Sequence, residues 1–112
     1  MKIYHNPRCS KSRETLEIIQ KAGKEVEIID YQNQVPTEKE LTAIIKLLGI
    51  NAEDLVRKSE DIYKEKFKGK NLTNTEWIKA MIKYPKLIER PIVISGNKAI
   101  IGRPPEKVIE LF

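Results

Sequence analysis

The fold is decided first by residues 2–31, which read KIYHNPRCSKSRETLEIIQKAGKEVEIIDY. The segment 2–5 is short, apolar and rich in β-formers, so it predicts a strand, and NPRCS breaks it. A helical pattern of apolar residues follows over 10–23 and ends at a glycine. A second strand is predicted over 26–31. A strand, a helix and a strand in this order normally form two parallel strands joined by a right-handed helical crossover.

The end of the chain predicts an antiparallel hairpin. The apolar segments PIVIS (91–95) and KAII (98–101) flank Gly96-Asn97, a two-residue turn that contains the required glycine. Pro104-Pro105 suits the first turn of a final helix. A parallel unit followed by a hairpin and a closing helix gives an α/β fold with a mixed four-stranded sheet. This order, βαβ then ββα, is the thioredoxin-like arrangement.

Between these halves the sequence predicts a helical insertion over about 37–89. Two capping boxes begin helices there, Thr37 with Glu40 and Thr73 with Glu76, and both precede helical apolar patterns. The highly charged stretch 51–70 predicts one or two short helices that are largely solvated. No repeat or low-complexity linker divides the chain, so residues 1–112 are expected to form a single domain.

Composition excludes several kinds of site. The chain has one cysteine and one histidine among 112 residues, which excludes an internal disulfide, a dithiol cycle within one chain and a metal site of several Cys and His ligands. We expect no bound metal or cofactor. No signal peptide or membrane-spanning run is present, and a lone thiol fits a reducing compartment, so a cytoplasmic location, with no membrane partner, is predicted. The net charge of +5 favours an anionic partner.

Cys9 is the candidate nucleophile because it stands where the first strand ends and the first helix begins. Helix N-terminal amides stabilise a thiolate, and His5, Arg8, Lys11 and Arg13 would act in the same direction. The alternative is a small buried thiol that packs as an apolar residue. The C-x-x-S spacing lacks a second thiol, so any disulfide or adduct at Cys9 would need an external thiol to resolve it.

Three arginines are candidate ligands for an oxyanion. Arg90 precedes Pro91 where the hairpin begins, and Arg103 precedes Pro104 where it ends, so the antiparallel strands bring their surroundings together. In a thioredoxin-like fold the proline before the third strand is commonly cis, which makes Arg90-Pro91 a candidate cis bond. The alternative for each arginine is a solvated surface position, and it is strongest for Arg57.

Four segments together resemble the glutaredoxin-linked arsenate reductases. They read IYHNPRCSKSRETLEII (3–19), LVRKSE (55–60), ERPIVI (89–94) and GRPPEKVIELF (102–112). The resemblance implies a thioredoxin-like fold with Cys9 as the nucleophile that attacks arsenate, and His5 as the residue that helps keep Cys9 ionised. It further implies that Arg57, Arg90 and Arg103 bind arsenate and arsenite. Glutathione would be the co-substrate and glutaredoxin the partner protein that together supply the electrons, and we expect the protein to be a monomer.

Other functions stay open on the same scaffold. One is a glutathione-dependent thiol transferase with another substrate, and a second is a regulator of the Spx type that binds a partner protein through the helical insertion. Nucleic-acid binding is disfavoured because the basic residues are dispersed among acidic ones without an aromatic stacking motif.

Overall fold

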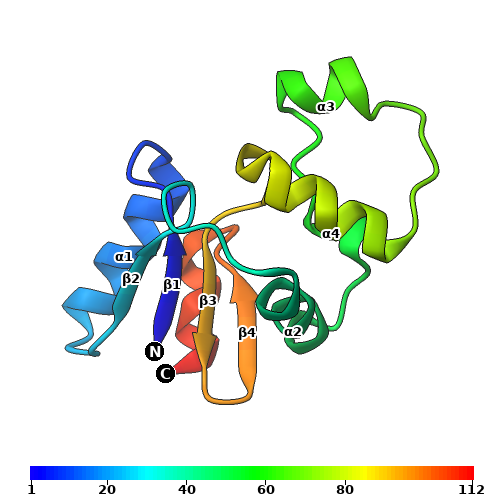
Figure 1. The fold of residues 1–112 in the computed structure, drawn as a ribbon. Coiled ribbons are helices and arrows are strands. Elements are labelled where there is room, and N and C mark those ends of the chain that lie inside the picture. The colour runs from blue at the N-terminus through cyan, green and yellow to red at the C-terminus, as the bar shows by residue number, and fades with distance from the viewer. The chain divides into compact units, whose positions relative to one another are not determined.

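The computed structural model describes residues 1–112, which form two compact units (Figure 1). The first unit comprises Met1–Gln34 and Arg90–Phe112, and the second comprises Val35–Glu89. The second unit covers the region in which the sequence predicts a helical insertion. That the whole chain makes a single domain stays a prediction.

The first unit contains a mixed four-stranded sheet with the thioredoxin-like order β2-β1-β3-β4. Strand β1 pairs with β2 in parallel and with β3 antiparallel, and β3 pairs antiparallel with β4. The bounds are β1 (Lys2–His5), α1 (Ser10–Lys21), β2 (Glu27–Asp30), β3 (Ile92–Ser95), β4 (Lys98–Ile101) and the 3-10 helix η3 (Pro105–Leu111). The predicted fold class is therefore confirmed. The second strand is shorter than predicted because β1 offers only four residues for pairing.

The core of the first unit lies between the sheet and two helices. Ile3 of β1 is paired in register with Val93 of β3, so both side chains leave the same face of the sheet. Ile19 of α1 and Val108 of η3 pack against them, and all four side chains are fully buried. Figure 1 shows α1 and the C-terminal helix on one face of this sheet. This packing fixes the start of α1, where Cys9 lies, against the carboxyl end of β1.

The second unit is helical, with α2 (Glu38–Leu48), η1 (Ala52–Leu55), α3 (Asp61–Lys66), α4 (Asn74–Lys83) and η2 (Pro85–Leu87). Both predicted capping boxes are present, at Thr37 and at Thr73. The prediction of largely solvated helices over 51–70 is wrong for the first of them. Ala52 and Leu55 are fully buried because the spacing of three residues places both on one side of η1. No helix of the chain has the length and apolar character needed to cross a membrane.

Gly102 allows a close approach between β4 and α1. A Cβ atom at this position would lie 2.6 Å from Thr15 Oγ1 and 2.8 Å from Pro91 Cγ. We therefore expect Gly102→Ala to lower the free energy of unfolding by about 1–3 kcal/mol, the usual cost of overpacking. Denaturant unfolding measures the change. In a Thr15→Ala background the same substitution should cost less, whereas an equal cost in both backgrounds would contradict the steric explanation.

Candidate active site around Cys9

Cys9 lies at the N-terminus of α1, at the residue that precedes the first helical turn. Its backbone is extended, with φ −97° and ψ 123°. Its N–H donates to the Asn6 carbonyl at 3.0 Å, and its own carbonyl accepts the Arg13 N–H at 3.0 Å. These bonds connect the loop after β1 to the helix. The thiol is partly exposed, so the alternative of a fully buried packing residue does not hold.

The two hairpin arginines converge on this thiol. Arg103 Nη2 donates to Cys9 Sγ at 3.3 Å, and Arg103 Nε donates to the Arg90 carbonyl at 2.8 Å. The peptide bonds Arg90-Pro91 and Arg103-Pro104 are both cis; the sequence predicted the first and missed the second. Arg90 is buried, so neither hairpin arginine fits the alternative of a solvated surface position.

The surroundings of Cys9 favour the thiolate. Burial raises the pKa of the Cys9 thiol, but the Ser12 N–H, the Arg90 side chain, the Arg103 charge and the Lys11 N–H together outweigh burial and lower it. The contribution of Lys11 therefore comes from its backbone, while its ammonium lies 3.6 Å from a Glu14 carboxylate oxygen. A lowered pKa increases the nucleophilic fraction at neutral pH.

We expect Cys9 to be alkylated rapidly at a pH where ordinary thiols react slowly. Its pKa is lowered, so the thiolate is present at lower pH, and the alkylation rate should reach half its maximum below the pH found for a free cysteine. Iodoacetamide labelling of this single thiol against pH, followed by mass spectrometry, gives the midpoint. Urea-unfolded protein is the control, and a midpoint equal in both states would contradict an activated thiolate.

His5 is connected to the site through Ser12. His5 Nδ1 lies 2.7 Å from Ser12 Oγ, and the Asn6 N–H donates to the same oxygen at 3.0 Å. All three residues are buried. Burial lowers the pKa of His5, the Asp30 charge raises it and the Arg13 charge lowers it, with a net lowering that favours neutral imidazole at pH 7. The geometry makes His5 a positioning residue for Ser12, and its predicted part in ionising Cys9 stays a prediction.

Tyr31 and Ser12 belong to the site, although the sequence analysis did not single them out for it. Tyr31 is fully buried, and its pKa is raised by burial, lowered by Arg90 and raised by the Cys9 charge, which places it in the same electrostatic environment. One signal in the sequence was available. His5 pairs with Asp30, so the residues that follow the parallel strands β1 and β2 lie at one edge of the sheet.

Arg57 lies in the second unit, where two carboxylates bind it. Its Nη1 donates to Glu89 Oε1 at 2.9 Å, and its Nε lies 3.8 Å from Glu60 Oε1. Its backbone N–H donates to the Leu87 carbonyl at 2.7 Å. The side chain is partly buried, unlike a solvated surface arginine. Its predicted contact with the oxyanion stays a prediction.

Comparison with known proteins agrees with this arrangement. The model of the ArsC family matches residues 4–111. The chain is 48% identical to the uncharacterized protein YfgD of Escherichia coli over 99% of this chain and 95% of that protein. It is 44% identical to an arsenate reductase of Haemophilus influenzae, over 98% and 97% of the two chains. The structure of an arsenate reductase from Vibrio cholerae superposes with a TM-score of 0.94 at 42% identity, covering 100% of this chain and 98% of the other. The chain belongs to the ArsC family.

Proposed function

We propose that the protein reduces arsenate to arsenite, with Cys9 as the nucleophile. The observation that best supports this is the contact of 3.3 Å between the Arg103 guanidinium and Cys9 Sγ. A guanidinium beside a thiolate both lowers the thiol pKa and offers permanently charged donors to an incoming tetrahedral oxyanion. Arg90 adds a second such group, since its side chain also favours the thiolate. The relatives in H. influenzae and V. cholerae named as arsenate reductases agree with the proposal.

The first step forms a sulfur–arsenic bond. The Cys9 thiolate attacks arsenic(V), and one arsenate oxygen leaves as water after protonation, which gives a covalent adduct. Arg90 and Arg103 would hold the remaining arsenate oxygens and offset their charge, so that arsenic stays in line with the sulfur. Arsenic is still pentavalent at this point, and two electrons are required.

The electrons come from two external thiols, because the chain has one cysteine. In the net reaction arsenate and two thiols give arsenite, one disulfide and one water. We assign the two thiols to glutathione and glutaredoxin, whose mixed disulfide carries away the oxidising equivalents and returns Cys9 to its thiol form. This cycle places the protein in the cytoplasm, where such thiols stay reduced.

A coupled assay tests the proposal. The protein is mixed with glutathione, glutaredoxin, glutathione reductase and NADPH, and NADPH oxidation is followed with and without arsenate. We expect arsenate-dependent oxidation that stops when either glutathione or glutaredoxin is omitted. Turnover of a disulfide substrate without any response to arsenate would indicate a thiol transferase instead. An absence of all turnover would leave a binding protein and contradict the proposal.

Arg57 is assigned to substrate binding within the same proposal. We expect Arg57→Ala to raise the KM for arsenate more than it lowers kcat, because a residue that binds the oxyanion alike before and during reaction contributes uniform binding. Lys39→Ala, an exposed position of the same unit, is the control. Because Arg57 also pairs with Glu89 and Glu60, thermal unfolding must accompany the kinetics. Unchanged kinetics would restrict Arg57 to a structural role.

A further inference from the structure

The excess positive charge of the chain is concentrated in one segment of the second unit. Residues 64–86 contain seven lysines and two glutamates, which gives +5, whereas the other 89 residues contain fourteen basic and fourteen acidic side chains. The expectation that basic residues are dispersed among acidic ones is therefore wrong for this segment. The active site at Cys9 lies outside the segment and does not account for this charge.

The same segment forms a groove, which we call the lysine groove. It has a volume of about 630 Å³ and lies between the end of α3, the loop that follows it and α4. Its apolar lining comes from Phe67, Leu72, Ala80 and Tyr84. A smaller hollow of about 340 Å³ shares Lys83 and Tyr84 with it, so the concave surface continues past Tyr84.

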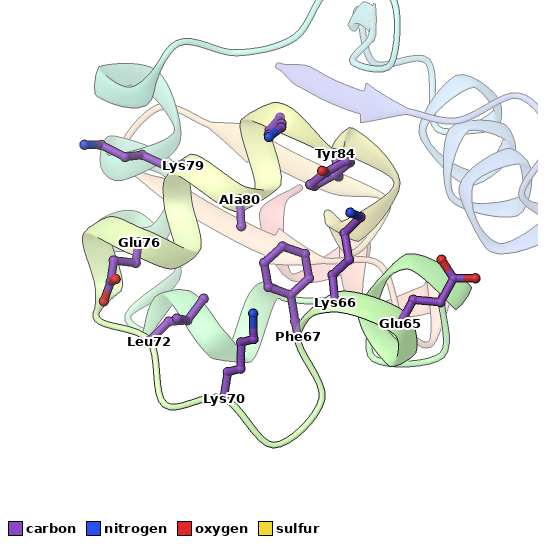
Figure 2. A pocket seen from close by; sticks show the side chains of 10 residues that line it. Glu65, Lys66, Phe67, Lys70, Leu72, Glu76, Lys79, Ala80 and Tyr84 are labelled. Carbon is purple, nitrogen blue, oxygen red and sulfur yellow. The ribbon is translucent and has the colours of Figure 1, made fainter.

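The rim of the lysine groove carries four lysines, Lys66, Lys70, Lys79 and Lys83. Two glutamates also border it, but neither neutralises the rim. Glu76 Oε1 accepts the Thr73 N–H at 2.9 Å as part of the α4 capping box, and Figure 2 shows Glu65 directed away from the other side chains. Figure 2 also shows Lys66 and Lys70 on either side of the Phe67 ring. The result is an apolar floor with a cationic border.

The floor is held in shape by aromatic packing. The Phe67 ring lies 5.7 Å from the Trp77 ring and 6.0 Å from the Tyr84 ring, the latter edge to face, and Trp77 is fully buried. Rings that pack against one another in this way leave no row of open faces for stacked bases, and arginine, the usual partner of phosphate, is absent from the lining. A concave apolar floor also differs from the convex or flat surface that binds a lipid bilayer.

We propose that the lysine groove binds an acidic amphipathic segment of a partner protein. Apolar side chains of that segment would occupy the floor between Phe67, Leu72 and Tyr84, and its carboxylates would pair with the rim lysines. Charge complementarity of this kind increases the association rate and sets the orientation, while the apolar contacts slow dissociation. The site does not require the proposed reduction of arsenate.

Peptide titration tests this interaction surface. The probe is a fluorescent amphipathic helical peptide whose polar face is all Glu and Asp and whose apolar face is Leu and Phe. One control peptide replaces Glu and Asp with Gln and Asn, and a second replaces Leu and Phe with Ser. We expect saturable one-to-one binding of the probe, weakened by about tenfold or more in each control peptide and by added salt. Equal binding of the probe and the Gln/Asn peptide would overturn the proposal, as would no saturable binding of the probe.

Protein variants locate the site. Lys66→Glu/Lys70→Glu should weaken probe binding by about tenfold, and Lys39→Glu/Lys107→Glu, which makes the same change in net charge at exposed positions elsewhere, should leave it unchanged. Leu72→Gln tests the floor without removing an aromatic ring. Amide chemical shifts of the labelled protein should move within 64–86 on titration. Equal weakening by both double variants, or shifts confined to the Cys9 unit, would overturn the assignment.

Two further probes separate the rival partners. Single-stranded DNA and vesicles of anionic lipid are titrated against the same variants. Weaker binding of both than of the acidic peptide supports the proposal. Tighter binding of either one, lost in Lys66→Glu/Lys70→Glu, would overturn the proposal in favour of a nucleic acid or a membrane surface.

Discussion

Replacing Cys9 with serine should reduce arsenate-dependent NADPH oxidation to the rate measured without the protein. A serine hydroxyl stays protonated at neutral pH, and Arg103 and the helix N-terminus do not lower its pKa enough to make it a nucleophile. The chain has no second cysteine to take over the reaction. The measurement is the coupled assay with glutathione, glutaredoxin and glutathione reductase at saturating arsenate.

The fold should survive this substitution. Serine is close to cysteine in size, and serine is also a preferred residue before a helix. Circular dichroism and thermal unfolding of Cys9→Ser should therefore match the native protein. Residual arsenate-dependent turnover in a folded Cys9→Ser protein would contradict the role of Cys9 as nucleophile.

Replacing Arg103 with alanine should lower kcat/KM for arsenate by about 10²–10³-fold, the usual effect of removing one donor from a site that stabilises developing negative charge. Two contacts would be lost, the hydrogen bond to Cys9 Sγ at 3.3 Å and the hydrogen bond to the Arg90 carbonyl at 2.8 Å. Because the Arg103 charge lowers the Cys9 pKa, its removal should raise the pH midpoint of iodoacetamide labelling.

Matched variants show whether charge or geometry matters at this position. Arg103→Lys keeps the charge but loses the planar fork, so it should restore most of the labelling midpoint and only part of kcat/KM. Lys107→Ala, at an exposed position of η3, should change neither quantity. An Arg103→Ala protein with native kinetics and a native labelling midpoint would show that the arginine is not part of the reaction.

Much of the fold could be predicted from short stretches of sequence. The two capping boxes at Thr37 and Thr73 are local hydrogen-bond patterns, and both occur in the structure. The hairpin turn at Gly96-Asn97 is equally local, and Gly96 has the positive φ of 59° that such a turn requires. The charged stretch around Ala52 and Leu55 was less predictable, because burial there depends on packing within the helical unit.

The sequence by itself determined that a single thiol stands between a strand and a helix, since both elements follow from local patterns and the thiol has no second partner in the chain. It also determined where the excess lysines lie. Only the tertiary structure decided that Arg103 reaches Cys9 across 94 residues and that Phe67 and Tyr84 form the floor of one groove. Contacts between distant residues depend on how the sheet and helices pack, and no local pattern encodes that geometry.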